Sequence, residues 1–529
     1  MCLMSRLTVE VSTRKALTLC FILGFIVRLI PEILAFPYPI SWDMVHYAYF
    51  MRVGIVWPHW SSFFTSTWLL YAFLFPIHNQ FGIDSFLLLK ITGPILFGFN
   101  VCGVYWFARS ALNWKGKKPL LVAGFFAVQL ASLRISWEFL RNTLGLGLLL
   151  FTLPLIKKLD SKRGFAAFIL LSLLTVFGHE YAAVTLLVIS SALIILGLVK
   201  GKEQQKVRAK RLIFAISPSL TVFLVGLYLR MFPVPYEHPP PVGPNLVYAK
   251  DTVQSSYGKM FFFVDYLGMN TSIDIYPNYL FLVLSVVALF ALLYGSYIYL
   301  VWKGFFRNEV LDIWTGLLLF GSFNCVVTPF FALQYWHRWM FMLVYPFTFY
   351  AVKGLEVLWK RMKKEKIGVN LRMLKGFRDK ASAMVLATVL LGVIYSATPF
   401  LMVNVGFGIY ALFPVCRYFA SSPTVPYQDV NGTIQAIHWL KDNMNGDSCA
   451  VMHSAFVAWA KLYLENSHNV IGYRNNVTLA LDLALQEGYK HIYFVCWNRN
   501  IGWYGVYVPK GFVEIERFNR ISVFEYSNI

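Results

Sequence analysis

One carboxylate directly follows the first long apolar run of the sequence and lies among aromatic residues. Asp43 is part of the segment SWDMVHY at 41–47, which also contains His46. A carboxylate at a membrane interface can act as a general base, which takes a proton from an attacking group, or as a metal ligand. The alternative is a solvated loop residue. Asp43 is therefore a candidate catalytic residue, and His46 is a candidate substrate-binding neighbour.

A second candidate catalytic carboxylate, Glu138, lies in the segment RISWEFLR at 134–141. Glu138 and Arg141 are three residues apart, so on a continuous helix they would share one face. The two residues could position a substrate. They could instead form an ion pair on a helix surface that has no role in catalysis.

An imidazole and a carboxylate, His179 and Glu180, interrupt a long apolar stretch further along the chain. A glutamate buried there would cost several kcal/mol unless it were paired. The two residues therefore either bind a substrate or form an exposed turn between two helices.

Two arginines could bind a phosphate group. Arg28 lies inside the first apolar run, and Arg338 follows His337 in the segment YWHRW at 335–339. A guanidinium group can hold a phosphate through two parallel N–H bonds. Each arginine could instead anchor its helix by reaching the lipid head groups. His337 is a further candidate for substrate binding because it adjoins Arg338.

The composition indicates that an integral membrane protein carries these residues. Of 529 residues, 58% are hydrophobic and 14% are charged, whereas soluble domains have about 25% charged residues. The net charge of +21 does not indicate nucleic-acid binding, because the basic residues occur in short clusters between apolar runs. The seven cysteines have no C-x-x-C spacing, so neither a zinc site nor a disulfide framework is expected.

About 11 apolar segments reach the length that a helix needs to cross a bilayer. They start near residues 16, 84, 119, 142, 164, 181, 212, 278, 310, 339 and 381. We therefore expect a polytopic α-helical membrane core over residues 1–403. A large first outer loop at 36–83 would contain one short re-entrant helix at 63–75.

Lys and Arg are distributed unevenly over the connections between these segments. About 28 lie on the side of the N-terminus and about 6 in the opposite loops, and the positive-inside rule places the richer side in the cytoplasm. We therefore expect a multi-pass protein of the cell membrane with a cytoplasmic N-terminus. All three N-x-[ST] sequons, at Asn270, Asn431 and Asn476, fall on the outer side, in agreement with this orientation.

The segment 404–529 alternates patterns that are typical of helices and strands. Helices are expected at 433–444, 456–465 and 479–487, and strands at 449–453, 469–473, 491–497, 512–517 and 521–526. The alternation predicts a small α/β domain, and the topology places this domain outside the cytoplasm.

These motifs resemble those of the GT-C superfamily of membrane glycosyltransferases, in the branch of protein O-mannosyltransferases and aminoarabinose transferases. The first outer loop of that branch has a pattern like D-E-x-H-[YF], which is similar to DMVHY at 43–47. Arg28 and Glu138 are similar to positions before and after this pattern, and a later R-Y, Pro and Gly motif resembles Arg338-Trp339, Pro346 and Gly354. The chain departs from the pattern at Met44, where an acidic residue is usual. It also lacks the W-W-D-Y-G motif of oligosaccharyltransferases.

The resemblance implies a polyprenyl-phosphate-linked sugar as donor. A hexosyl group would pass, with inversion, to a hydroxyl of a protein, lipid or glycan acceptor outside the cytoplasm. Asp43 would be the base, Arg28 and Arg338 would bind phosphate, and Glu138, Arg141, His179 and Glu180 would position the substrates. A divalent cation, Mg²⁺ or Mn²⁺, is the one cofactor left open, and its ligands are unknown. The alternatives are a transporter or flippase of lipid-linked sugars, which often has internal repeats that this chain lacks, and a membrane assembly subunit.

Overall fold

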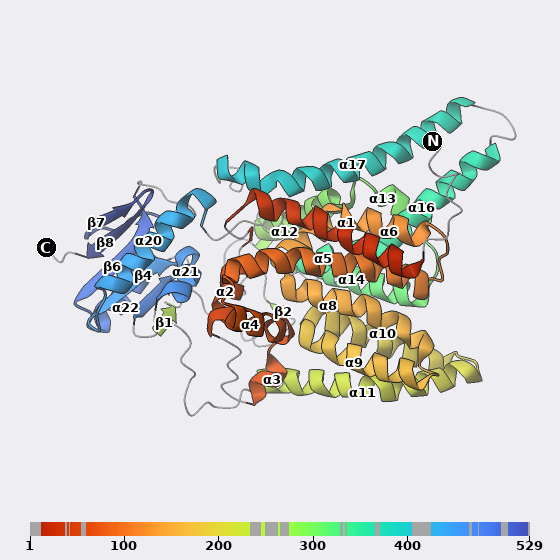
Figure 1. Cartoon of the computed structure of the whole chain (residues 1–529), viewed down its shortest axis with the longest axis horizontal. Coiled ribbons are helices and arrows are strands. Elements are labelled where there is room, and N and C mark those ends of the chain that lie inside the picture. Colours follow the sequence, from red (N-terminus) through yellow and green to blue (C-terminus); the bar gives the residue numbers. More distant parts are fainter. Residues whose placement is uncertain are drawn as a thin grey trace.

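The computed structural model describes residues 12–37, 40–41, 43–53, 60–232, 245–248, 263–264, 275–327, 332–333, 336–365, 371–404, 425–464, 468–473, 476–498 and 506–526. Within these residues, the chain forms a bundle of long helices with a smaller sheet-containing domain at one end (Figure 1). Asn270 lies outside the described residues.

Eight helical segments in this part of the chain are long and apolar enough to cross a membrane. They are α1 (Thr13–Leu34), α5 (Ser85–Ser110), α8 with the short helix η1 (Leu140–Lys158), α10 (Glu180–Val199), α11 (Glu203–Met231), α14 (Glu309–Val327), Trp336–Lys360 in α15 (Trp336–Met342) and α16 (Val344–Glu365), and Lys380–Ala397 in α17 (Leu371–Asn404). The prediction of a polytopic helical membrane protein is therefore confirmed.

The expected number of about 11 spans is not confirmed, because two of the expected spans are bent helix pairs and one is short. The count rises to ten if each bent helix pair is one span. One pair is α6 (Lys118–Ala127) with α7 (Leu130–Glu138), bent by 60°, and the other is the end of α12 (Ile275–Tyr294) with α13 (Ile298–Gly304), bent by 76°. The remaining segment, α9 (Lys162–Gly178), has 17 residues.

The first outer loop contains three helices, α2 (Asp43–Val53), α3 (Ser61–Thr65) and α4 (Leu69–Phe81). The expectation of a single helix at 63–75 is wrong, because the backbone is extended at Ser66. The Ser66 hydroxyl donates to Ser62 O at 2.6 Å, and the Trp68 indole N–H donates to Phe63 O at 3.0 Å. These bonds occupy the carbonyls at the end of α3, so that the chain turns before α4 begins.

The C-terminal domain has a six-stranded sheet in the order β1-β5-β4-β6-β8-β7. Its helices and strands match the expected ones closely: α20 (Tyr427–Asn443), β4 (Ser448–His453), α21 (Ser454–Tyr463), β5 (Asn469–Tyr473), α22 (Val477–Gln486), β6 (His491–Trp497), β7 (Phe512–Phe518) and β8 (Ile521–Tyr526). One strand was not expected. β1 (Asn245–Tyr248) comes from the connection between α11 and α12 and pairs in parallel with β5.

The first outer loop joins the bundle to this domain. Helix α2 packs against α21, and Arg52 Nη1 donates to Leu462 O at 2.5 Å. The rings of Phe86 and Trp459 lie 5.9 Å apart. Helix α2, which begins at Asp43, therefore lies between the helical bundle and the C-terminal domain.

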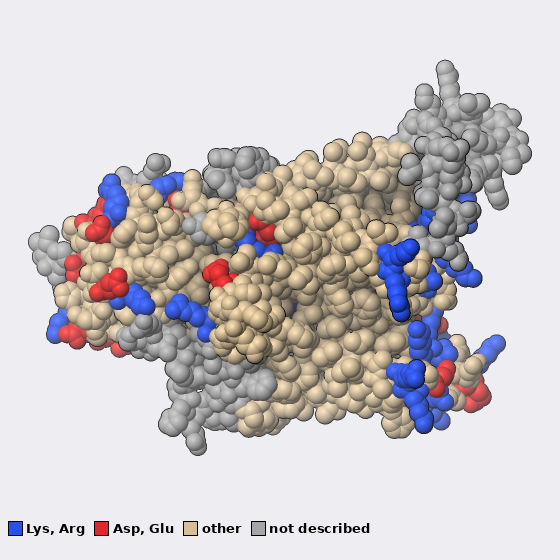
Figure 2. All heavy atoms as spheres, in the orientation of Figure 1, with Lys and Arg blue, Asp and Glu red and all other residues tan. Residues whose placement is uncertain are grey.

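Charged side chains gather at the two ends of the molecule and leave an uncharged belt between them on the face that Figure 2 shows. Lys and Arg dominate the end opposite the C-terminal domain (Figure 2). Large apolar side chains are exposed along α1, with Ile33 at 63% and Leu19 at 56%. This distribution fits a helical bundle surrounded by lipid acyl chains.

The charge distribution predicts which end is accessible from outside the cell. A cysteine at position 490, made by Lys490→Cys, should react with a membrane-impermeant maleimide in intact cells, and one at position 162, made by Lys162→Cys, should react only after lysis. Both positions are exposed. The background needs Cys2 and Cys416 replaced by serine, because the other five cysteines are buried. Labelling of position 162 in intact cells would contradict this orientation and indicate the reverse one.

Candidate active site

The first turn of α2 places Asp43 at the outer end of the bundle. The helix buries Val45, Ala48 and Met51 in a cluster that also contains Leu140 and Leu144 of α8 (Leu140–Thr152). This packing fixes α2 against the bundle. The amino-terminal end of a helix favours a negative charge, so the carboxylate at its first position suits the local structure.

Asp43 interacts electrostatically with charged groups from three other segments. They are Arg134 and Glu138 of α7, Arg141 of α8 and Arg338 of α15. Asp43 lies outside the membrane-spanning segments, and burial, followed by the charge of Glu138, raises the pKa of Asp43 to about 6. The three guanidinium groups act in the opposite direction. A carboxyl group with a pKa in this range can take up a proton near neutral pH.

The carboxylate of Glu138 pairs with Arg134, whose Nη2 lies 2.5 Å from Oε2. The expectation that Glu138 and Arg141 share a helix face is wrong, because the helix is interrupted between them. Phe139 has φ −98° and ψ 61°, which ends α7 before α8 begins. The partner of Glu138 is instead the residue one turn earlier in α7.

Two arginines of the cluster share an aromatic neighbour. The Arg338 guanidinium carbon lies 4.4 Å from the centre of the Phe139 ring, and that of Arg134 lies 5.1 Å from the same ring. Cations at such distances are attracted to the face of a ring. His337 is half-buried beside them, and its ring centre lies 6.0 Å from that of Phe341.

Arg141 connects this cluster to His179 and Glu180. Its Nη1 donates to Thr67 Oγ1 at 2.7 Å. The Arg141 guanidinium also interacts electrostatically with Glu180 and His179. Glu180 also pairs with Arg230 Nη2 at 3.2 Å, and the two residues line a small pocket next to Thr67. His179 Nδ1 accepts a hydrogen bond from Tyr181 N at 3.2 Å and so caps α10. The His179-Glu180 turn is therefore largely a buried and paired one.

His46 lies on the side of α2 toward the C-terminal domain. Its imidazole is partly buried, and burial together with the charges of Lys461 and Arg141 lowers the pKa of His46. His46 is therefore neutral near pH 7 and could accept or donate a hydrogen bond.

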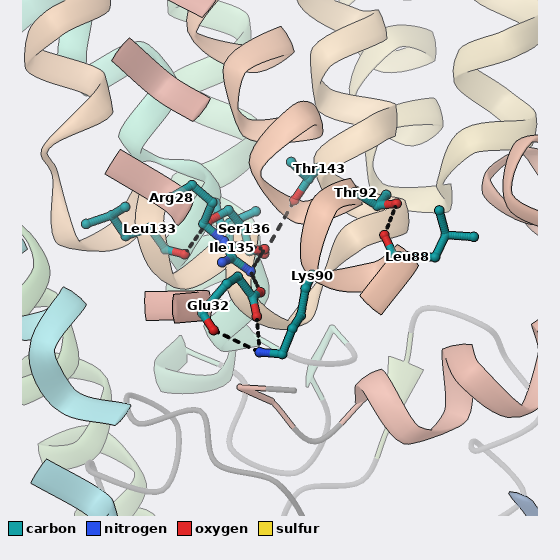
Figure 3. A network of polar contacts seen from close by, with 9 residues as sticks. All are labelled: Arg28, Glu32, Leu88, Lys90, Thr92, Leu133, Ile135, Ser136 and Thr143. Atoms are coloured by element: carbon teal, nitrogen blue, oxygen red, sulfur yellow. Dashed lines mark hydrogen bonds and ion pairs between the residues drawn. The ribbon is translucent and has the colours of Figure 1, made fainter. Parts of the chain in front are cut away.

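Arg28 has a different environment from the one expected for a phosphate-binding residue (Figure 3). It is fully buried, and its Nη2 lies 2.8 Å from Glu32 Oε1. The second oxygen of Glu32 lies 3.1 Å from Lys90 Nζ. Arg28 also donates two hydrogen bonds of 3.2 Å to Ser136 O. Arg28 thus holds α7, the helix that carries Arg134 and Glu138.

Two charged residues of the candidate site, Arg134 and Arg230, were not predicted from the sequence. The i,i+4 spacing of Arg134 and Glu138 could have predicted their ion pair. No sequence signal joins Arg230, at the end of α11, to Glu180, because the two residues are 50 positions apart.

The residues around Asp43 do not fit a divalent cation. The neighbouring Met44 side chain supplies no oxygen, Glu138 is paired with Arg134, and three guanidinium groups interact electrostatically with Asp43. In the described part of the chain, no three His, Cys, Asp or Glu side chains gather at one point. A divalent cation prefers several oxygen ligands, whereas this cluster has a surplus of positive charge that suits an anion.

Neither a protein-family profile nor a curated protein sequence matches the chain. Several solved structures align with it, including the following three. ArnT from Cupriavidus metallidurans bound to undecaprenyl phosphate has 11% identity and a TM-score of 0.48, covering 96% of this chain and 97% of that one. The archaeal oligosaccharyltransferase AglB from Archaeoglobus fulgidus, in complex with an inhibitory peptide and a dolichol-phosphate, has 12% identity and a TM-score of 0.46, over 91% and 69%.

The third structure is the arabinofuranosyltransferase AftD from Mycobacteria, with 12% identity and a TM-score of 0.48 over 98% of this chain and 40% of that one. Two of the three structures are thus named as transferases of sugars. Since all three TM-scores are below 0.5, these similarities support no conclusion about function.

The buried network around Glu32 should be important for stability. Glu32→Gln would leave Arg28 and Lys90 as uncompensated buried cations, and we expect a loss of about 3–5 kcal/mol in the free energy of unfolding. Glu203→Gln is a matched control, because the carboxylate of Glu203 also pairs with a lysine but is 85% exposed. The control should change the unfolding free energy by about 1 kcal/mol or less. Thermal and denaturant unfolding in detergent would measure both, and equal effects would contradict this role for the network.

Proposed function

We propose that the protein is a membrane glycosyltransferase of the GT-C type, which moves a sugar from a polyprenyl-phosphate donor to an acceptor hydroxyl. One observation carries the proposal: a carboxylate with a pKa raised toward neutrality lies within electrostatic reach of three arginines at one end of a helical bundle. This combination supplies a base for the acceptor and cations for a lipid phosphate. The basic end of the bundle lies opposite the end that carries Asp43. By the positive-inside rule, this supports transfer outside the cytoplasm.

The reaction requires one base and one stabilised leaving group. The acceptor oxygen forms a bond to the anomeric carbon while the bond from that carbon to the phosphate oxygen breaks, and the configuration inverts. Asp43 takes the proton from the acceptor hydroxyl. Arg338, with Arg141 or Arg134, stabilises the charge that develops on the lipid phosphate. The phosphate needs no acid to protonate it, because it is already a good leaving group.

The other candidate residues have positioning roles in this proposal. Glu138 orients Arg134, and His179 with Glu180 holds the Arg141 side of the site. Arg28 fixes the position of α7 through its hydrogen bonds to Ser136 O. The acceptor, a protein, lipid or glycan, approaches from the side of the C-terminal domain, where His46 and Lys461 lie. Metal-independent transfer follows from the positive surroundings of Asp43, and full activity in the presence of a chelator would agree with this.

The proposal is tested with purified protein and a radiolabelled polyprenyl-phosphate sugar. Transfer of the label to an acceptor, with release of the polyprenyl phosphate, is the expected result. Movement of the labelled lipid between the leaflets of a vesicle without cleavage would identify a flippase instead. The absence of both, together with stable binding of another membrane protein, would identify an assembly subunit.

Asp43→Asn should lower kcat by at least about 100-fold, because a positioned base contributes about 10²–10⁴-fold to catalysis. Asp447→Asn is the control, since Asp447 is exposed in the C-terminal domain. Donor binding should be unchanged in both variants. Full turnover by Asp43→Asn would exclude Asp43 as the base.

The raised pKa of Asp43 also predicts the pH profile. A base must be ionised, so kcat/KM should rise as the pH increases through about 6 and reach a plateau above it. This acidic limb should be absent from the residual activity of Asp43→Asn. A limb that persists in the variant would belong to another group.

Arg338→Ala should raise the donor KM or lower kcat without loss of the fold. Arg338→Lys should restore activity only in part, because an ammonium group lacks the paired N–H donors of a guanidinium. Arg517→Ala, at an exposed position in β7, serves as the control. Steady-state kinetics at varied donor concentration would separate the two effects, and wild-type kinetics for Arg338→Ala would remove this residue from the site.

A further inference from the structure

A second cavity lies at the end of the bundle opposite the candidate active site. Its volume is about 300 Å³, and it lies among η1 (Leu153–Lys158), the end of α10, the first turns of α11 and the start of α14. Cavities of about 300 Å³ and more can hold a small ligand or a head group. The residues proposed above for glycosyl transfer do not line it.

Basic side chains dominate the charge of this cavity. Lys157, Lys200 and Arg208 line it, against one carboxylate, Glu309. Asp160 lies 3.7 Å from Arg208 but is shared with Arg211. The cavity therefore keeps a positive surplus, and Arg208 repels Lys157. A bound anion would relieve this repulsion.

Apart from Gln205 and Asn308, the rest of the lining is apolar or glycine, and it continues onto the lipid-facing surface. Leu193, Leu196 and Ile156 line the cavity. Beside them on α10, Val199 is 73% and Ile195 is 60% exposed. A charged head group in the cavity would thus have apolar surface next to it for acyl chains.

We propose that this cavity binds the phosphate head group of an anionic membrane lipid from the leaflet at the basic end of the protein. Basic pockets between membrane helices on this side bind such head groups in other proteins. A soluble phosphate would use the three cations but would leave the apolar walls in contact with water. The lipid uses both parts of the lining and holds the ends of α10, α11 and α14 together.

The binding is measured by native mass spectrometry of the full chain, with phosphatidylglycerol added to protein in detergent and phosphatidylcholine as the neutral comparison. The variant is Lys200→Gln with Arg208→Gln. Each basic side chain near an anionic lipid contributes roughly a fivefold gain in affinity, so the pair should weaken phosphatidylglycerol binding by roughly 25-fold. Phosphatidylcholine binding should be weak and the same in all proteins.

The matched control is Lys162→Gln with Arg163→Gln, which removes the same charge from the same end at exposed positions outside the cavity. The control should bind phosphatidylglycerol like the wild type. An equal loss in the control would show non-specific attraction to the basic end and overturn the proposal. Displacement of the lipid by millimolar inorganic phosphate would also overturn it, in favour of a soluble anion.

A single variant tests the proposal even if the double variant misfolds. Lys200 is exposed at the end of α10, so Lys200→Gln should keep the fold, and its unfolding temperature without lipid should match the wild type. We expect a roughly fivefold weaker affinity for phosphatidylglycerol and a smaller rise in unfolding temperature when this lipid is added. Unchanged affinity in this variant would contradict the site.

Discussion

A charged side chain near the membrane can stay buried only if another group compensates it, and the outer end of the bundle is arranged around this constraint. The guanidinium groups of Arg134, Arg141 and Arg338 come from three segments and interact electrostatically with Asp43. Arg134 also pairs with Glu138, and Arg338 lies over the Phe139 ring. Because each group needs the others, the ends of α2, α7, α8 and α15 are held at one point. Their dipoles and charges are thus oriented before any substrate arrives, which is what electrostatic catalysis requires.

The same constraint explains the layer behind the cluster. Arg28, Glu32 and Lys90 compensate one another within the bundle and fix α7 through Ser136 O. The sequence placed Arg28 near the outer end of α1 but could not distinguish a phosphate ligand from a member of a buried network. That distinction depends on Glu32 and on Lys90, which is 58 residues away from Glu32.

The fold was predictable wherever a local pattern determines it. The strands at 469–473, 491–497 and 521–526 were predicted with the observed bounds, because alternation and length are properties of a few adjacent residues. Asp43, Glu138 and Arg338 were selected in the same way, from a charge in apolar surroundings, and the structure brings these three residues together. The break at Phe139 gives no such pattern, so Arg141 was assigned to the same helix face as Glu138. Arg134 was missed although its i,i+4 spacing to Glu138 lies within α7. The bends after α6 and α12 give no local pattern either, and they leave the span count of about 11 unconfirmed.

Strand β1 has a consequence for how this architecture can be divided. It comes from residues 245–248, yet it covers the side of β5 that would otherwise end the sheet. A fragment made of residues 425–526 alone would present β5 as an uncovered edge with unpaired backbone groups, which favours self-association. The sheet of the C-terminal domain is therefore complete only together with residues 245–248. A recombination event that replaced it would have to exchange two separate stretches of the gene together, so the core and its outer domain are expected to evolve as one unit.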